Sequence, residues 1–335
     1  MLRSAPISCS IRGYAEQFLF SATSDRTPTR SARKMELCKC FCKQFVRPSR
    51  ILRGRRLSTT ALRDNRTESA GAKNDEDREK TTHFGFKTIR ESEKEKEVRT
   101  VFENVADSYD VMNDAMSLGI HRVWKDIFVQ ELGPTHGCRL LDAAGGTGDI
   151  TFRYLNYLNN LPNPKGVRSH VTVSDINQNM LDVGKARAQR QGYTVENGYD
   201  ISWLQGDAEK LPCSAESFTA YTIAFGIRNV THIDKVLEDA YRVLQPGGRF
   251  MCLEFSHLNN DTLQWVYDKY SFQMIPVLGT LIAGQWEPYQ YLVESIRRFP
   301  RQEEFKEVIE NAGFRQVTYK NLTFGVVAIH SGFKI

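Results

Sequence analysis

Three glycines between an apolar run and a predicted helix constrain this chain more than any other feature. In LDAAGGTGDI, residues 141–150, Gly145, Gly146 and Gly148 fall within four residues. Glycine gives up backbone order and offers no side chain to a core, so this clustering is expected where a ligand must approach the backbone closely. The stretch therefore indicates a ligand-binding turn between a strand and a helix. A tight turn that binds nothing is the alternative.

Predicted strands and helices alternate along the chain from about residue 98 onwards. The β-rich runs are CRLLDA, HVTVSD, ISWLQGD, FTAYTIAFG and RFMCLEFS, and stretches such as INQNMLDVGKARAQR between them have apolar residues at helical spacing. This alternation predicts βαβ units and a doubly wound, mainly parallel α/β sheet of the Rossmann-like kind. Two further strand runs, FRQVTYK and FGVVAIHSGF, predict a C-terminal antiparallel hairpin and bring the sheet to seven strands.

The N-terminal 60 residues have the composition of a mitochondrial transit peptide. Residues 1–63 contain 14 Lys or Arg, three acidic residues and many Ser and Thr, without a sustained apolar face. A disordered basic tail is the alternative. Residues 61–97 are polar and charged and are expected to form a linker, although the aromatic residues of HFGFKTI within it are expected to dock on the main body.

The charge of the chain argues against a nucleic-acid partner. The net charge of +5 comes from the N-terminal segment, because residues 64–335 carry 31 basic and 37 acidic residues. A protein with this balance is not expected to bind nucleic acid through a basic surface. No metal site is expected either, since the cysteines of CKCFCK, residues 38–43, have no His or Cys cluster at zinc spacing beside them.

Acidic residues after the next two predicted strands indicate that the ligand is a nucleoside. Asp175 ends the second strand, where its carboxylate can accept hydrogen bonds from both ribose hydroxyls. Asp207 follows the third strand, where its side chain or the Ala208 amide would meet an adenine edge. The loop has G-G-x-G in place of G-x-G-x-x-G, and Asp175 lies 30 residues after Gly145, which disfavours NAD.

In this order the motifs resemble those of a known enzyme class. LDAAGGTGDI, VSDINQNML, GDAEKLP and RVLQPGGRF are similar to the successive motifs of class I S-adenosylmethionine-dependent methyltransferases. More narrowly, FENVADSYDVMNDAMSLGIHRVWK, AFGIRNVTHIDKVLEDAYRVLQPGG, LEFS and GVVAIHSGFK resemble the C-methyltransferases of ubiquinone and menaquinone biosynthesis, over residues 98–335. The N-terminal composition points to the ubiquinone branch. The resemblance implies S-adenosylmethionine as cofactor and a methoxylated polyprenyl benzoquinol as substrate.

The resemblance also implies which residues contact the cofactor. These are Thr147, Asp175, Asp207 and Ala208, beside the three glycines of the loop. Ala224 departs from the family pattern, because bacterial members have a serine there. We therefore do not expect a hydroxyl contact to the cofactor at this position.

Methylation of a ring carbon requires an ionised hydroxyl beside it. A phenol with a pKa near 10 is ionised to about one part in a thousand at pH 7, a deficit of roughly 4 kcal/mol. Arg228 and Asn229, which follow the fourth strand, are the best candidates to face that oxygen. The family resemblance gives Arg228 a catalytic role. Because a guanidinium stays protonated, we expect Arg228 to stabilise the phenolate while water takes the proton. A structural ion pair is the alternative.

Residues 98–130 are expected to form an N-terminal helical lid of the methyltransferase domain. This segment is rich in aromatic residues and methionine, and Tyr109, Asn113 and His121 are candidate polar contacts to the quinol ring. His121 is also a candidate base, since its pKa is near the working range. Ordinary helix packing is the alternative reading of each of these residues.

The resemblance implies a place for the protein as well as a reaction. It predicts a location in the mitochondrial matrix, peripheral on the matrix face of the inner membrane, and membership of a multi-subunit ubiquinone-biosynthesis complex; a homodimer is also open. FQMIPVLGTLIAGQW, residues 272–286, is too short to span a bilayer. It is a candidate groove for the polyprenyl tail, and ordinary core packing is the alternative. Methylation of RNA or of another small molecule is one alternative function. A cofactor-binding scaffold that holds a biosynthetic complex together is another, and stabilising such a complex is also open as an added role of the enzyme.

Overall fold

A computed structural model describes most of the chain from residue 80 to its end. The residues outside the description are 1–79, 106–112, 115–116, 118, 259 and 284–285. The predicted transit peptide, most of the predicted linker and Tyr109 therefore lie outside the described residues.

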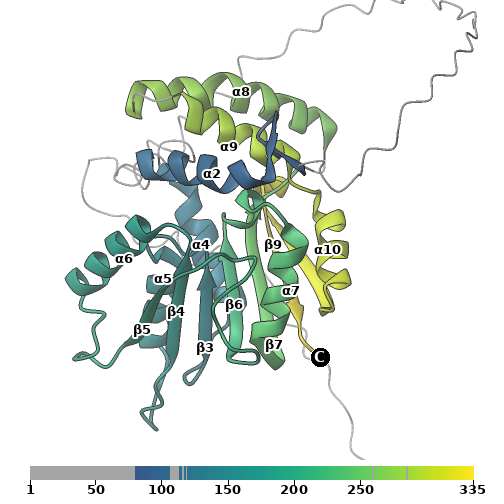
Figure 1. The fold of residues 1–335 in the computed structure, drawn as a ribbon. Helices are drawn as coiled ribbons and strands as arrows, with labels where there is room; N and C mark the ends of the chain where they lie inside the picture. The colour runs from purple at the N-terminus through teal and green to yellow at the C-terminus, as the bar shows by residue number, and fades with distance from the viewer. Residues whose placement is uncertain (1–79, 106–112, 115–116, 118, 259, 284–285) are drawn as a thin grey trace, which may run out of the picture. The chain divides into compact units, whose positions relative to one another are not determined.

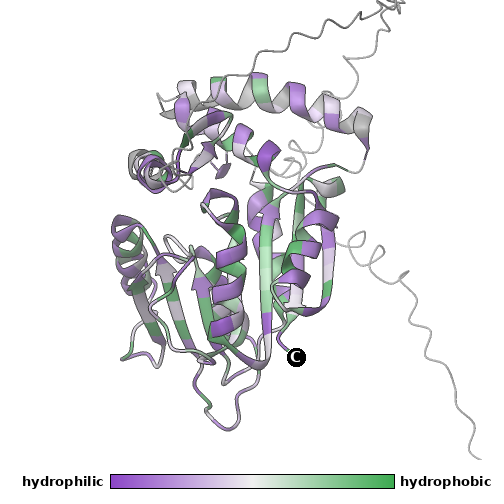
Figure 2. Ribbon diagram, turned by 45° about the vertical axis from the view of Figure 1, so that its right-hand side comes forward, coloured by the Kyte–Doolittle hydropathy of each residue, from purple (hydrophilic) through white to green (hydrophobic). Residues whose placement is uncertain are grey.

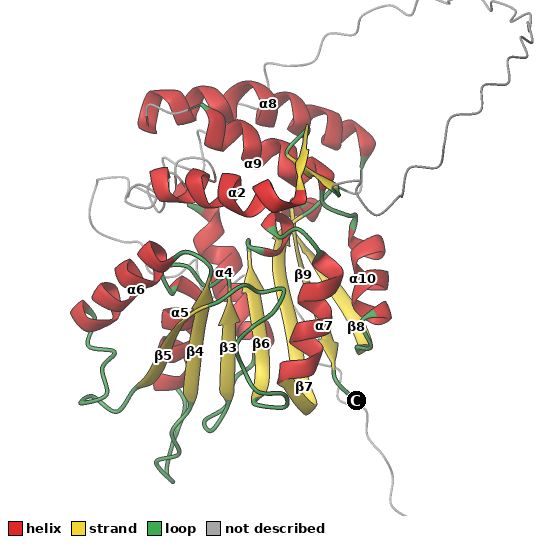
Figure 3. Cartoon of the chain, viewed as in Figure 1, coloured by secondary structure: helices red, strands yellow, loops and turns green. Residues whose placement is uncertain are grey.

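A seven-stranded sheet forms the centre of the described fold (Figure 1, Figure 3). Its strands, in spatial order, are β5 (Asp200–Gln205), β4 (His170–Asp175), β3 (Arg139–Ala143), β6 (Phe218–Ala224), β7 (Leu244–Phe255), β9 (Val327–Phe333) and β8 (Arg315–Leu322). The first five pair in parallel, and β9 pairs antiparallel with both β7 and β8. The predicted doubly wound, seven-stranded sheet with a C-terminal antiparallel hairpin is confirmed.

Helices cover both faces of this sheet. One face carries α4 (Ile120–Leu132), α5 (Asp149–Asn159) and α6 (Gln178–Arg190), and the other carries α7 (Ile233–Val243) and α10 (Gln302–Asn311). Successive residues of β3 point into opposite cores, because side chains alternate along a strand. Leu140 is buried with α4 and α5, and Leu141 with α7 and α10. The central strands are accordingly largely hydrophobic in Figure 2, as expected of a sheet buried on both faces.

Residues 80–97 differ from the predicted linker. They form a hairpin of β1 (Thr81–Phe84) and β2 (Lys87–Arg90) and the start of α2 (Glu91–Val105). The aromatic residues of this hairpin dock as expected: Phe84 stacks on Tyr291 with ring centroids 4.2 Å apart, and Phe86 lies 6.0 Å from Phe272. A polar segment is ordered here because a few long-range contacts hold it.

Two further helices, α8 (Asp261–Ala283) and α9 (Glu287–Arg298), pack against each other, and α9 also contacts α2 (Figure 1). Pro276 lies inside α8, and the helix continues through it. In the part of the chain that the structure describes, no helix is long and apolar enough to cross a membrane.

Candidate active site

A cleft of about 340 Å³ lies at the carboxyl ends of four neighbouring strands. Its walls include residues 144–147 after β3, 175–177 after β4, 206–209 after β5 and 224–226 after β6. Residues of α2 and α4 also line it. Ligands of doubly wound sheets bind at this edge, and the volume is in the range of small-molecule sites.

The glycine loop and Asp175 are joined directly. The Gly146 backbone N–H donates to Asp175 Oδ2 over 2.9 Å, and the Asn177 N–H donates to Asp175 Oδ1 over 2.9 Å. A Cβ atom on Gly145 would lie 2.7 Å from the Val173 side chain, so the loop lies too close to β4 for any larger residue. The two motifs that the sequence placed 30 residues apart therefore form one wall of the cleft.

Six of the seven predicted cofactor contacts line this cleft. They are Gly145, Gly146, Thr147, Asp175, Asp207 and Ala208. Gly148 is the exception among them. It precedes α5 with φ at +81°, and an added Cβ would lie 2.9 Å from the Trp203 ring, so glycine is needed there for the turn and for packing. Gly148 therefore has a structural role in the turn, and its contact with the cofactor stays a prediction.

Asp142, the acidic residue that precedes the glycine loop, holds the start of the loop in place through hydrogen bonds. Its side chain is fully buried and accepts hydrogen bonds from the hydroxyls of Thr151 (2.8 Å) and Thr222 (2.9 Å). Burial raises the pKa of Asp142 to about 6, although the two hydroxyls act to lower it. Asp142 therefore ties β3 to β6 and α5 where the loop leaves the sheet.

The cleft is strongly acidic. The described acidic residues that line it are Glu91, Glu95, Asp142, Asp149, Asp175, Asp207 and Glu209. Its described basic residues are Arg99, Lys125 and His232. His232 lies between two of the carboxylates, 2.8 Å from Glu209 and 3.3 Å from Glu91. This balance favours a ligand that carries positive charge.

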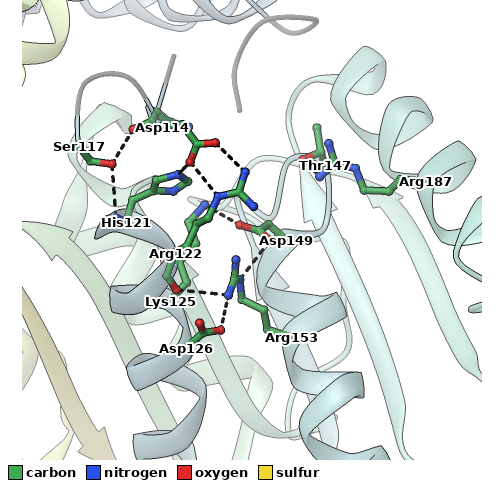
Figure 4. A network of polar contacts seen from close by, with 11 residues as sticks. Asp114, Ser117, His121, Arg122, Lys125, Asp126, Thr147, Asp149, Arg153 and Arg187 are labelled. Carbon is green, nitrogen blue, oxygen red and sulfur yellow. Dashed lines mark hydrogen bonds and ion pairs between the residues drawn. The ribbon is translucent and has the colours of Figure 1, made fainter. Parts of the chain in front are cut away.

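Lys125 is a cleft residue that the sequence analysis missed. It is buried, and its Nζ lies 2.7 Å from Asp149 Oδ2 (Figure 4). Burial acts to raise the pKa of Asp149, but the charges of Lys125 and Arg153 outweigh it and the pKa lies below its usual value. The available signal was a lysine in the HRVWKDIF run, at helical spacing from His121, Trp124 and Phe128, which are buried on the same face.

His121 lies outside this cleft. Its Nε2 is 2.9 Å from Asp114 Oδ1 (Figure 4). His121 lines a separate polar groove of about 590 Å³ between α4, α5 and α6, which we call the outer groove. Burial lowers the pKa of His121, while the bond to Asp114 opposes the change. The structure therefore does not bring the candidate base His121 to the cofactor loop.

Arg228 forms the ion pair that the sequence analysis left as an alternative. It lies on the short helix η3 (Ile227–Asn229), and its Nη1 donates to Glu254 Oε1 over 2.9 Å and to the Phe225 carbonyl over 2.6 Å. The two charged side chains are 5% and 1% exposed. Burial raises the pKa of Glu254, and the Arg228 charge acts against it. Arg228 is not among the described residues that line the cleft, whereas Asn229 is.

Comparison with known proteins extends over nearly the whole chain. The model of the ubiE/COQ5 methyltransferase family matches residues 90–334. The mitochondrial 2-methoxy-6-polyprenyl-1,4-benzoquinol methylase of Drosophila melanogaster is 65% identical over 309 residues, which are 92% of this chain and 99% of that protein. The proteins of the same name from Homo sapiens and Dictyostelium discoideum are 55% and 50% identical, covering 80% and 83% of this chain and 88% and 93% of theirs.

Proposed function

Because the chain belongs to the ubiE/COQ5 methyltransferase family, we propose that it methylates a ring carbon of a 2-methoxy-6-polyprenyl-1,4-benzoquinol in mitochondrial ubiquinone biosynthesis. The protein is an S-adenosylmethionine-dependent methyltransferase. The observation that carries the proposed substrate is the 65% identity to the Drosophila methylase over 99% of that protein. The acidic cleft at the glycine loop supports the cofactor.

The residues of the cleft fit S-adenosylmethionine in size, charge and order. The cofactor supplies an electrophilic methyl group on a positively charged sulfur. Asp207 follows β5, Asp175 ends β4 and the glycine loop follows β3, so three contact points lie side by side along the edge of the sheet. In that order we assign the adenine end to Asp207, the ribose to Asp175 and the amino-acid end to the loop. Lys125, beside the loop, is then placed to bind the amino-acid carboxylate.

The chain also has to hold the quinol and control its ionisation. Asn229 lines the cleft, and its Oδ1 accepts a hydrogen bond from the Tyr291 hydroxyl over 3.1 Å, which fixes its amide. Phe225 lines the cleft beside it, and its backbone is held at φ +58° with its carbonyl bonded to Arg228. Such positions occur at sites that the surrounding structure over-determines. We assign this corner to the quinol ring.

Methyl transfer to carbon is the expected result when the purified protein is incubated with S-adenosylmethionine and a reduced, short-chain 2-methoxy-1,4-benzoquinol. Mass spectrometry of the product should locate one added methyl group on the ring. The oxidised quinone is the control, since an electrophilic ring has no carbon that can attack. Binding of the cofactor without transfer to the quinol, while RNA or another small molecule is methylated, would contradict the proposal.

The protein is mitochondrial, as the names of its relatives indicate. We propose further that it lies on the matrix face of the inner membrane and that residues 1–60 direct its import. The outer side of α8 supports a membrane contact, because Trp265 is 62% exposed there, with the Lys269 ammonium 5.2 Å from its ring centroid. Aromatic and basic residues together suit a lipid headgroup region. Complex membership and a homodimer stay predictions.

We expect Trp265→Ser to weaken co-sedimentation with anionic phospholipid vesicles about tenfold, since the indole would lose its apolar burial. Tyr319→Ser, a change at another exposed aromatic residue on β8, is the matched control. Equal vesicle binding by both variants and the unmodified protein would remove α8 from the membrane contact.

A further inference from the structure

A second, smaller cavity lies beside the cofactor cleft. Its volume is about 60 Å³, and residues of the β1–β2 hairpin, α2, η3 and α9 line it. Val230 and Thr231 line both this cavity and the cofactor cleft, so the two spaces adjoin at a single loop. A water molecule takes up about 30 Å³. The cavity therefore has room for an oxygen substituent and its hydrogen-bond partners, while the ring that carries the substituent has to lie outside.

This cavity, which we call the cationic pocket, is lined by four basic side chains. They are His83, Lys94, Arg228 and Arg298. None of its described lining residues is acidic. His83 and Arg298 are exposed, whereas Lys94 is 4% exposed and Arg228 is buried with it. Burial and the charges of Lys94 and Arg298 lower the pKa of His83, which reflects the crowding of positive charge.

Two polar groups of the pocket are incompletely paired. Lys94 Nζ donates to the carbonyl of Val230 over 2.8 Å, and this neutral acceptor is its hydrogen-bond partner among the described residues. Arg228 pairs with Glu254 through Nη1, but its buried Nε has no partner within the described part of the chain. Buried charged groups are costly without compensation. An anionic oxygen bound in the pocket would supply that compensation.

We propose that the cationic pocket binds the quinol hydroxyl beside the methylated carbon, and that Lys94 accepts its proton while Arg228 stabilises the resulting phenolate. The inference rests on the proposed function and adds a catalytic residue to it. Lys94 can act as the base in this step, whereas the Arg228 guanidinium stays protonated and cannot accept a proton. The pocket offers both a buried amine and a buried guanidinium next to the cofactor cleft.

The proton and electron balance of the step is simple. The quinol O–H bond breaks as a third N–H bond forms on the Lys94 amine. The ring carbon then bonds to the transferred methyl group as the methyl–sulfur bond breaks. The hydrogen on that carbon leaves to water as a proton, the ring regains its aromaticity as a phenolate, and Lys94 returns its proton to the oxygen. One proton is released for each methyl group transferred.

The surroundings of Lys94 favour an amine that can lose its proton. Burial lowers the pKa of Lys94, and the carboxylates of Glu209 and Glu91 act in the opposite direction. A base with a lowered pKa is closer to the working pH, which increases its efficiency in proton transfer. The charged and titratable groups around it are Glu91 on its own helix, Glu209 after β5, His232 before α7, His83 on β1, Arg228 on η3, and Tyr291 and Arg298 on α9.

Two substitutions at position 94 separate proton transfer from charge. Lys94→Met removes both the proton acceptor and the positive charge, whereas Lys94→Arg keeps the charge but cannot accept a proton. We expect both to lower kcat at pH 7 about 100-fold or more, with an unchanged KM for S-adenosylmethionine because Lys94 does not line its cleft. Turnover of the unmodified protein should rise with pH and level off above the pKa of Lys94. In both variants it should keep rising, about tenfold per pH unit, towards the phenol pKa near 10.

A binding measurement gives a second readout without turnover. With S-adenosylhomocysteine present, reduced 2-methoxyhydroquinone should bind to the unmodified protein as its phenolate, seen by its longer-wavelength absorbance. Lys94→Met should shift that ionisation to higher pH. Lys96→Met, on the exposed side of the same helix, is the matched control and should change neither measurement. Thermal unfolding of each variant checks that the fold is kept.

Lys94→Arg with the turnover and pH profile of the unmodified protein would overturn the inference, because charge alone would then suffice. So would phenolate binding that is the same with and without Lys94. If the unmodified protein bound S-adenosylhomocysteine but methylated no quinol, the proposed function itself would fail, and the two failures are thus distinguishable.

Discussion

Glu254→Leu is expected to lower the free energy of unfolding by about 3–5 kcal/mol, because the substitution leaves the Arg228 guanidinium buried without its carboxylate. Both side chains are almost fully buried, and Arg228 would keep the Phe225 carbonyl and the Phe255 ring as neutral neighbours. These cannot replace the lost charge. Urea unfolding followed by circular dichroism measures the change, and a loss below about 1 kcal/mol would show that Arg228 finds water or another partner.

The double variant Arg228→Met, Glu254→Leu separates the ion pair from catalysis. Replacing both partners of a buried pair by apolar residues of similar volume is often neutral or stabilising, so most of the stability should return. Turnover should stay at least 100-fold below that of the unmodified protein, because an oxyanion-stabilising donor contributes about that factor. A stable double variant with near-normal turnover would exclude a catalytic role for Arg228. Its role would then be the structural ion pair with Glu254.

The fold was predictable because its signals are local. Buried parallel strands are short apolar runs, and the helices between them repeat at a period that a single sequence reveals. Asp175 and the glycine loop were also placed together correctly, since consecutive strand ends of a doubly wound sheet meet at one edge. The predicted hairpin at the C-terminus followed from two β-rich runs with a short connection.

Residues whose partners are distant in sequence could not be placed. Lys94 belongs to a charged run that reads as solvent-exposed, and it is buried because the loop at Val230 and helix α9 cover it. Lys125 and His121 share one helix, yet they line different cavities, since a single turn of α4 separates the cofactor loop from the outer groove. Gly148 looks like a loop glycine in sequence, and its contact with Trp203 appears only in three dimensions.

Lys125→Met is expected to weaken the binding of S-adenosylmethionine by a factor of about 10 to 100, because a hydrogen bond to a charged group contributes about 1.5–3 kcal/mol. Decarboxylated S-adenosylmethionine keeps the sulfonium and the amine but lacks the carboxylate that we assign to Lys125. Its affinity should therefore differ little between the variant and the unmodified protein. Titration calorimetry with the two ligands measures the interaction between one side chain and one carboxylate.

Arg153, the second basic residue that pairs with Asp149, provides the control for this prediction. Arg153 Nε donates to Asp149 Oδ1 over 3.1 Å, but Arg153 lines the outer groove and not the cofactor cleft. If Lys125 acts by holding Asp149 and the loop in place, Lys125→Met and Arg153→Met should weaken both ligands to similar extents. If it binds the carboxylate, Lys125→Met alone should discriminate between the ligands. Equal losses for both ligands in Lys125→Met would therefore reassign this lysine from the cofactor to the loop.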